Sequence, residues 1–541
     1  MDKKIKDPIY GYVKIPVEYM EEIIDKAEFQ RLRRILQTSY SPLYSSAIHN
    51  RFVHSIGVFH LGSIAAETLR KEMNAKELLS GDVAEQMIRV YRLACLLHDV
   101  GHAPFSHTGE CFYKNEAFQS VELHARIGEL VGDKDFTTEL LKMESNAAAP
   151  HELMSVIIGL KVFGKSIGSR KDKEFFARCI TGYLYMDGTK ENQIRNCFIT
   201  MLNSKVIDVD RLDYLIRDAY ITGFATINID YQRLLKALTI VEYKEKYQIT
   251  YKKDAVSIIE NVVYAHDAEK KWIQNHPVVL YESYIIKHII VHLNNKLNED
   301  EKRLFSEAAL SREGVELQDG VKVSLLCDDD IIYLYKNVYP DELSMELLDR
   351  EKRRHPVWKS EAEYMGYISE LSKGEFKTMF DDCISALAAG KTKDIPSFIR
   401  ITPGYIQSLK QELERVKSLT TSDKEKNRSI EQNYKGIQRK LAVCNFLKKS
   451  ARDNKIDCDF VILKADMFTS SFSKQELANT LLVFNDNEAE DIFELDKVSP
   501  LLKSDTTKDN MFYIFYRRKN HNHIKDKKEF CKSLVVKTID T

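Results

Sequence analysis

The chain has 541 residues, 44% of them hydrophobic, which is enough to fill more than one hydrophobic core. Its 80 Lys and Arg against 81 Asp and Glu leave a net charge of −1, so the overall composition gives no electrostatic footprint for nucleic acid or anionic lipid, and nucleic-acid binding is not indicated. A charged N-terminus, the lack of any apolar run of about 18 residues, and nine cysteines without a C-x-x-C spacing predict a soluble, cytoplasmic protein without a membrane span.

Helix signals dominate the chain. Apolar residues recur every three or four positions, and glycine (21) and proline (11) are sparse, so the fold is predicted to be mainly α. One helix is expected over 84–99, stopped by Gly101 and Pro104, and another over 208–222, closed by Gly223.

β-Structure is predicted in two places. Two β-rich runs around a charged turn indicate a hairpin over 239–253. The highly charged segment 411–450 is expected to form exposed helices with a turn near 421–428, and three runs typical of strands follow it: 456–468, 479–486 and 510–519. We therefore expect a helical core over residues 1–300, a helical extension and linker over 301–450, and a small α+β C-terminal lobe over 451–541.

Histidines are concentrated in about one fifth of the chain. A lone His is more often a hydrogen-bonded core residue than a ligand, and core packing would explain only one or two members of such a cluster. The cluster therefore indicates a chemical site, and it contains eight of the fifteen histidines: 49, 54, 60, 98, 102, 107, 124 and 151.

The dipeptide His98-Asp99 falls in the last turn of a predicted helix, where the partial negative charge of the helix end disfavours an aspartate. A divalent cation would compensate for it. The dipeptide alone proves little, because the same pair at 266–267 lies in an ordinary helical context. Upstream and downstream residues complete a set of two imidazoles and two carboxylates that suits Mg, Mn, Fe or Zn: His54, His98, Asp99 and Asp210.

The sequence around these residues resembles that of one known family. The blocks "DPIYGYVKIP", "FQRLRRILQ", "HNRFVHSIGV", "LLHDVGHAPFSH", "HELMS" and "DVDRLDYLIRDAYITG" look, in this order, like those of the HD-domain deoxynucleoside triphosphate (dNTP) triphosphohydrolases, which include bacterial dGTPases and sterile-alpha-motif/HD enzymes. The resemblance implies an HD-domain catalytic core over 1–300. It also implies one divalent metal ion per active site and attack at the α-phosphorus, which releases deoxynucleoside and intact triphosphate.

The resemblance also implies roles for individual residues. The four residues above would hold the metal, His102 and His107 would lie against the phosphates, and His151 would donate a proton to the departing 5′ oxygen. The catalytic set would be His107, His151 and Asp210, and the substrate-binding set Gln37, Arg51, His102, His107, Arg211, Tyr214 and Asp218.

The spacing of the helix that begins near Asp210 agrees with a substrate role, because Tyr214, Arg217 and Asp218 approach the same face. By resemblance, Gln37 and Tyr214 would hold the sugar. Two plainer readings stay open at this stage. Tyr214 is equally well explained as a core aromatic, and one of the nearby arginines, at 211 or 217, as part of a structural ion pair.

Departures from the family pattern leave further alternatives. An insertion over 112–147 carries His124, a reserve candidate for the acid, and could be a lid or a subunit contact. His266 stands where the family has a phosphate-binding arginine, which would leave that task to Lys270 or Lys271.

Assembly and regulation follow from the resemblance alone. Family members form tetramers or hexamers, so a homo-oligomer with a possible activating nucleotide is expected. Asp25 matches a position that reads guanine, and Arg33 lies nearby, but the simpler interpretation is that both are surface charges on an amphipathic helix.

Two other functions are compatible with the same metal site or the same fold. An HD phosphohydrolase could act on another nucleotide, such as a cyclic nucleotide or an RNA phosphodiester, and a non-catalytic nucleotide sensor could use the same fold. A role in antiviral defence, through loss of DNA precursors, is an expectation from the family only.

Overall fold

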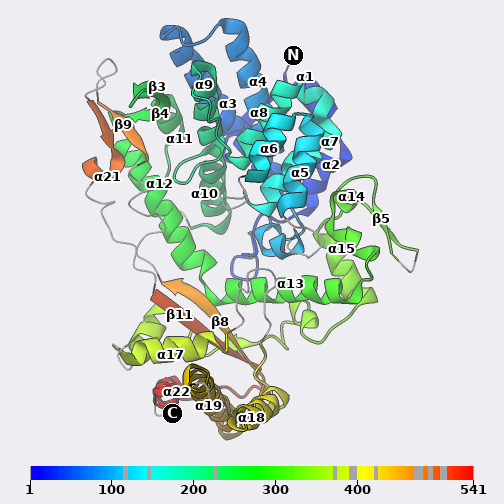
Figure 1. Cartoon of the computed structure of the whole chain (residues 1–541), viewed down its shortest axis with the longest axis vertical. Helices are drawn as coiled ribbons and strands as arrows, with labels where there is room; N and C mark the ends of the chain where they lie inside the picture. Colours follow the sequence, from blue (N-terminus) through cyan, green and yellow to red (C-terminus); the bar gives the residue numbers. More distant parts are fainter. Residues whose placement is uncertain are drawn as a thin grey trace. The chain divides into compact units, whose positions relative to one another are not determined.

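The computed structural model describes residues 2–113, 120–142, 148–224, 228–317, 320–369, 375–388, 399–419, 424–467, 479–484, 491–499 and 509–539. It is mainly α-helical with a few small sheets, as predicted (Figure 1). Among the residues described, no helix combines the length and the apolarity that crossing a membrane requires.

The chain divides into two compact units that are discontinuous in sequence. The first comprises Met1–Lys270, Ile290–Tyr339 and Thr469–Thr506, and the second comprises Lys271–Ile289, Pro340–Phe468 and Thr507–Thr541. The boundaries expected at 300 and 450 differ from these, because pairing between strands far apart in sequence assigns segments to each unit.

Helices form most of the first unit. Their bounds are α1 Val17–Tyr19, α2 Ala27–Gln30, α3 Arg51–Ala75, α4 Gly81–Leu97, α5 Ser120–Val131, α6 Lys134–Lys142, α7 Pro150–Ile167, α8 Arg170–Thr181, α9 Lys190–Leu202, α10 Val209–Thr222, α11 Tyr231–Lys236, α12 Val256–Glu269, α14 Glu307–Leu310, α15 Asp328–Tyr333 and α21 Leu495–Val498. Helix α13, Pro277–Lys296, is divided between the units.

The strands of the first unit form three small sheets. A hairpin of β1, Asp2–Asp7, and β2, Gly11–Pro16, opens the chain, and β5, Val315–Glu316, pairs with β6, Lys322–Val323. The predicted hairpin is confirmed as β3, Leu238–Tyr243, and β4, Lys246–Lys252.

The β3–β4 hairpin gains two strands from late in the sequence. Strand β9, Leu481–Val483, pairs in parallel with β4, and β10, Ile492–Glu494, completes the order β10-β9-β4-β3. Part of the expected C-terminal lobe therefore belongs to the first unit.

Local signals set the ends of the helices that carry the site. Helix α3 is capped by Asn50, whose side chain accepts a hydrogen bond from the Val53 N–H, and α10 is capped by Asp208. Helix α10 ends at Gly223, whose φ of +70° is the left-handed conformation that glycine adopts without strain. Helix α3 packs against both α4 and α10, which brings segments more than a hundred positions apart together.

The second unit combines a three-stranded sheet with helices. Its sheet has the order β7-β11-β8, from β7 His355–Pro356, β8 Phe460–Met467 and β11 Asp509–Tyr516. Its helices are α16 Glu361–Tyr364, α17 Glu375–Ser385, α18 Pro403–Lys417, α19 Lys424–Asp453 and α22 Lys527–Ile539. The strands predicted at 456–468 and 510–519 are thus confirmed. Of the predicted turn near 421–428, residues 421–423 lie outside the described residues, and 424–428 belong to helix α19. Residues 114–119 and 143–147 of the insertion also lie outside the described residues.

Candidate active site

The four predicted metal ligands converge in the first unit from three elements. His54 lies in α3, His98 and Asp99 directly follow α4, and Asp210 lies in the first turn of α10. The Nε2 atom of His54 is 2.9 Å from Oδ1 of Asp210, 3.3 Å from Nε2 of His98 and 3.5 Å from Oδ2 of Asp99. His54, His98 and Asp99 are buried, whereas the Asp210 side chain is 40% exposed and provides the open side of the cluster.

The far nitrogens of both imidazoles are already engaged, which leaves Nε2 of each ring directed into the cluster. The Nδ1–H of His54 donates to Oδ2 of Asp213 at 2.7 Å, and the Nδ1–H of His98 donates to the carbonyl of Cys95 at 3.0 Å. Carboxylates and carbonyls in this position fix the tautomer that a metal requires. The arrangement of donors therefore fits a divalent transition metal ion or Mg.

Asp213 was not identified from the sequence. It is fully buried and also accepts hydrogen bonds from the Tyr10 hydroxyl at 2.7 Å and from Arg217 at 2.9 and 3.0 Å. Arg217 further pairs with Asp7 at 3.0 Å, so the structural ion pair is the reading that holds for this arginine. The one feature of the sequence that could have pointed to Asp213 is its position about one helical turn after Asp210.

The charges of the cluster favour a bound cation. Burial opposes protonation of His54, but its hydrogen bonds to Asp210 and Asp213 and the charges of those carboxylates outweigh burial and raise the pKa of His54 to about 9. Burial likewise opposes ionisation of Asp99, yet the neighbouring Arg51, at 2.7 Å, holds the pKa of Asp99 well below its usual value. The Asp99 carboxylate is thus charged and would attract a metal ion.

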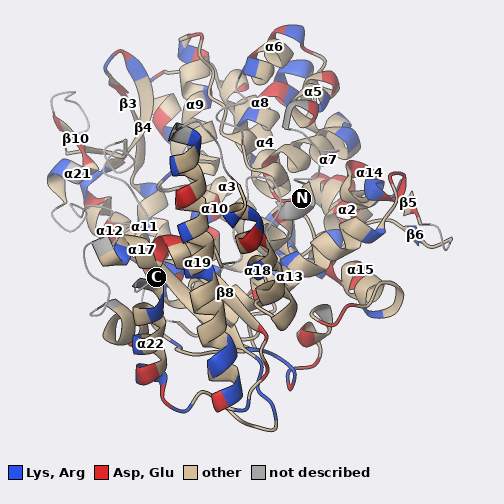
Figure 2. Cartoon of the chain, turned by 60° about the horizontal axis from the view of Figure 1, so that its bottom comes forward, with Lys and Arg blue, Asp and Glu red and all other residues tan. Residues whose placement is uncertain are grey.

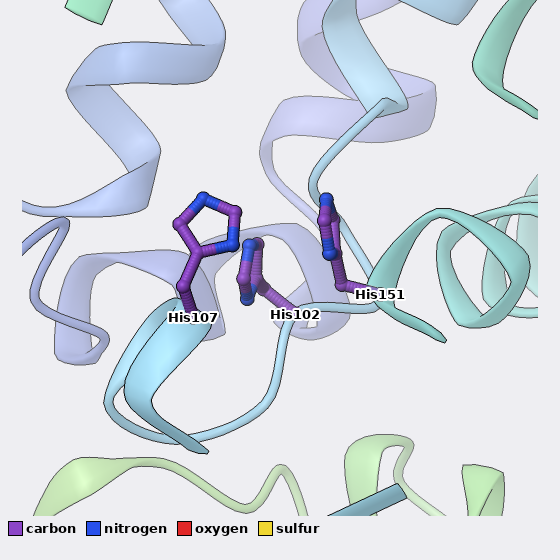
Figure 3. A group of neighbouring side chains, drawn as sticks. All are labelled: His102, His107 and His151. Carbon is purple, nitrogen blue, oxygen red and sulfur yellow. The ribbon is translucent and has the colours of Figure 1, made fainter. Parts of the chain in front are cut away.

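A second cluster lies within the same unit and contains three predicted residues, His102, His107 and His151 (Figure 3). The ring of His102 stacks on that of His151 with centroids 4.4 Å apart, and His107 stands edge-on to both at 5.1 and 5.0 Å. Glu110 joins two of them, because its Oε1 accepts from Nδ1–H of His107 and of His151, each at 2.7 Å. Sequence reasoning missed Glu110, which lies three residues after the end of the block LLHDVGHAPFSH.

These contacts shift the pKa values of His151 and His102 in opposite directions. Burial disfavours charge on His151, but the hydrogen bond and the charge of Glu110 prevail and raise the pKa of His151. Burial, with Arg51 adding to it, lowers the pKa of His102 well below its usual value, so that ring is neutral. Neither ring nitrogen of His102 has a hydrogen-bond partner among the described residues, so both can engage a ligand.

A cavity of about 120 Å³ connects the two clusters with the start of α10. Arg211 is anchored there, donating to the carbonyls of Lys205 and Val206 at 2.6 and 2.8 Å. The cavity is lined by His98, His151, Glu152, Ile180, Leu202, Asn203, Ser204, Asp208, Asp210, Arg211 and Tyr214. Tyr214 therefore faces the cavity instead of serving only as a core aromatic.

Asp218 is placed differently from the expectation. It is buried, its Oδ1 accepts a hydrogen bond from Nε2–H of His49 at 2.6 Å, and it does not line the cavity. The contact with substrate that the sequence suggests for Asp218 stays a prediction.

Two further buried polar residues each have one side-chain atom without a hydrogen-bond partner among the described residues. Gln37 is buried, and its side-chain oxygen accepts no hydrogen bond from any described residue. Arg51 donates through Nε to the Ser106 hydroxyl at 2.8 Å, but its Nη2 has no such partner. Both atoms are therefore available to a bound molecule.

The loop that carries His107 is held by a residue far away in sequence. Phe105 and Ser106 have φ of +60° and +54°, which is unusual for residues with a side chain. The buried carboxylate of Asp328 accepts the Phe105 N–H at 2.7 Å and the Leu36 N–H at 2.9 Å, tying this loop to the segment that carries Gln37. No local pattern identifies Asp328, because its partners lie more than two hundred positions away.

The remaining candidates lie outside the cavity. Asp25 and Arg33 are exposed, and the Arg33 guanidinium lies 3.5 Å from the centre of the Phe52 ring. His124 is buried in α5, with Nε2 2.8 Å from the Tyr183 hydroxyl, and does not line the cavity.

A family model described as HD domain matches residues 51–197. The chain contains an HD domain. The matched range runs from the start of α3 into α9 and thus includes three of the four candidate metal ligands, while Asp210 lies beyond it.

Similarity to known proteins extends beyond the HD domain. The chain is 29% identical over 262 residues to an uncharacterized protein of Mycoplasma genitalium, covering 47% of this chain and 52% of that protein. It is 27% identical over 409 residues to the deoxynucleoside triphosphate triphosphohydrolase SAMHD1 of Xenopus laevis, covering 73% of this chain and 61% of that one. The chain spans about half the length of the first curated relatives it matches.

The fold has counterparts among solved structures. A phosphohydrolase from Bacteroides thetaiotaomicron superposes with a TM-score of 0.55 at 17% identity, covering 96% of this chain and all of the other. This likeness shows the fold alone. With the HD domain and the dNTP triphosphohydrolase relatives, the resemblance indicated by the motifs is confirmed.

Proposed function

We propose that the chain hydrolyses deoxynucleoside triphosphates to deoxynucleoside and inorganic triphosphate with the help of a divalent metal ion. The observation that carries the proposal is the placement of the Glu110–His151 pair beside the donor set of His54, His98, Asp99 and Asp210, with one cavity reaching both. A metal held by those four residues would polarise a phosphoryl oxygen as a Lewis acid.

The second cluster would supply the proton. His151, whose pKa is raised by Glu110, would hold a proton on its ring and donate it from Nε2 to the departing 5′ oxygen, while Glu110 fixes the orientation of the ring through Nδ1. The neutral ring of His102 and the exposed ring of His107 would donate hydrogen bonds to phosphate oxygens. The short separation of the two rings, with centroids 5.1 Å apart, supports a shared role on one phosphate chain.

The substrate would be recognised by side chains with unused polar atoms. Nη2 of Arg51 would bind a phosphate oxygen, and the side-chain oxygen of Gln37 would accept from the 3′-hydroxyl of the sugar. Tyr214, with Arg211 beside it, would lie under the sugar and exclude a 2′-hydroxyl. Lys270, which belongs to the first unit, would add charge for the triphosphate.

Regulation belongs to the same proposal. We expect a homo-oligomer, tetrameric or hexameric, in which an activating nucleotide contacts Asp25 and Arg33, both of which are exposed. Depletion of DNA precursors would give such an enzyme an antiviral role, and plating phage on cells that carry wild type or Asp210→Ala tests it.

A substrate panel tests the proposal directly. The purified chain would be incubated with Mn or Mg and with each dNTP, each NTP, cyclic dinucleotides and RNA, and the products separated by chromatography. Deoxynucleoside and triphosphate in equal amounts are expected. Release of monophosphates, or cleavage of the cyclic or RNA substrates alone, would favour the phosphodiesterase reading, and nucleotide binding without any product would favour the sensor.

A further inference from the structure

The turn of the β1–β2 hairpin contributes two buried polar side chains close to the metal-ligand cluster. Asp7 ends β1, and its Oδ1 accepts the N–H groups of Ile9 and Tyr10 at 2.8 and 3.0 Å, which shapes the turn. Both Asp7 and Tyr10 are buried. The block DPIYGYVKIP therefore carries two polar groups that the proposed reaction does not use.

Both side chains act on the carboxylate that orients His54. The Tyr10 hydroxyl donates to Oδ1 of Asp213 at 2.7 Å, and Nδ1–H of His54 donates to Oδ2 of Asp213 at 2.7 Å. Asp7 reaches this carboxylate through Arg217, whose Nη1 donates to Oδ2 of Asp7 at 3.0 Å and whose Nε and Nη2 donate to Asp213 at 2.9 and 3.0 Å. His54 thus shares Asp213 with three other N–H or O–H donors.

Burial strengthens the interactions within this network. Figure 2 shows acidic and basic residues intermixed along α5 and α6, where water and salt screen exposed charges. By contrast, Asp7, Asp213 and Arg217 are 3%, 0% and 1% exposed. Buried charges interact through a lower effective dielectric constant than exposed ones. A change at one partner of Asp213 should therefore be felt by the others.

The backbone of α3 is adapted to the same contact. Gly57 lies about one helical turn after His54, and a Cβ atom on it would fall 1.9 Å from Oδ1 of Asp213 and 2.5 Å from Nη2 of Arg217. A glycine lets these two side chains approach the helix closely. Helix α3 therefore provides both the metal ligand and the space that the Asp213–Arg217 pair occupies beside it.

We propose that Asp7 and Tyr10 are positioning residues for the metal ion. Together they set how strongly Asp213 accepts the hydrogen bond from His54, and hence how tightly His54 holds the metal. A carboxylate that hydrogen-bonds a metal-ligating imidazole fixes the ring and increases its basicity as a ligand. The proposal deepens the metal-binding part of the proposed function and rests on it.

The two residues should have opposite effects. Tyr10 competes with His54 for the carboxylate of Asp213, so it weakens the hold on the metal. Asp7 neutralises part of the positive charge that Arg217 would otherwise place on Asp213, so it strengthens that hold. A turn that only stabilised the fold would behave differently, because loss of either contact would then lower stability and metal affinity in parallel.

The test titrates the metal-free full chain with Mn²⁺ in a calorimeter, without nucleotide, and records the thermal midpoint in EDTA. Tyr10→Phe should lower the thermal midpoint and yet tighten Mn²⁺ binding by about two- to tenfold, which corresponds to one neutral hydrogen bond. Asp7→Asn should weaken Mn²⁺ binding about tenfold, at the low end of the effect of residues outside the ligand set.

Matched controls make the same changes at exposed positions of this hairpin, Tyr12→Phe and Asp2→Asn, and should bind Mn²⁺ like wild type. Weaker or unchanged binding in Tyr10→Phe, unchanged binding in Asp7→Asn, or no Mn²⁺ binding by wild type would overturn the proposal. Since nucleotide is absent, these outcomes do not depend on the substrate. If wild type hydrolyses dNTPs while both variants bind Mn²⁺ equally well, the proposed function stands and this inference alone fails.

Discussion

Glu110 offers the sharpest test of the proposed proton donor. Its Oε1 accepts two hydrogen bonds of 2.7 Å, one from His107 and one from His151. Glu110→Gln keeps the size of the side chain and removes its charge. A hydrogen bond between charged groups contributes about 1.5–3 kcal/mol. If the His151 bond acts fully in the transition state, its loss lowers kcat by roughly 10- to 150-fold.

The same substitution should also shift the pH dependence of kcat in a defined direction. His151 donates only when protonated, and Glu110 raises its pKa, so activity is present below that pKa and is lost as the pH rises through it. Without the carboxylate the pKa of His151 falls, because the largest contribution that opposes burial is lost and only the charges of Glu152 and Asp99 remain. The alkaline limb of kcat against pH should therefore move to lower pH in Glu110→Gln.

The assay is steady-state dNTP hydrolysis from pH 5.5 to 9.5 at saturating metal. The matched control is Glu67→Gln, which removes a carboxylate from a surface pair with Arg70 on α3. An unchanged alkaline limb in Glu110→Gln, with kcat within twofold of wild type, would refute the role of Glu110 and, with it, the reason for choosing His151 as the acid.

The other predictions concern metal, orientation and packing. His98→Ala should lose bound metal and turnover together, whereas His151→Ala should keep the metal, measured by elemental analysis, and lose about 10²- to 10⁴-fold in kcat; full activity of His151→Ala would exclude it as the donor. Asp213→Asn should weaken metal affinity about 10- to 100-fold in calorimetric titration, and an unaltered affinity would contradict its orienting role. Gly101→Ala should lower the free energy of unfolding in urea by at least about 1–3 kcal/mol, since its Cβ would lie 2.3 Å from backbone atoms of residues 154 and 155; wild-type stability would show that the helix can shift.

The sequence was informative wherever the determinant is local. The period of apolar residues places α4 and α10, and a single glycine with a left-handed backbone ends α10 at Gly223. The turn of the β3–β4 hairpin is equally local. Residue types also pointed to the candidate metal ligands, because imidazole and carboxylate groups at His98 and Asp99 are unusual at the end of a buried helix, and the structure brings both together with His54.

Contacts between segments that are distant in sequence could not be predicted from such local patterns. Nothing near Asp328 reveals that its carboxylate holds the loop of Phe105, and nothing near Glu110 reveals its bond to His151. Spacing likewise put Asp218 on the substrate face, but the packed neighbour His49 takes its carboxylate instead.

Sequence alone thus determined which segments become helices and which residue types could bind a metal, because hydrogen bonding and hydrophobic period act over a few positions. Tertiary packing decided which side chains meet, which of them are charged and which compact unit each strand joins. These depend on burial and on partners hundreds of positions away, and the free energy of a buried charge is set by whatever surrounds it in space.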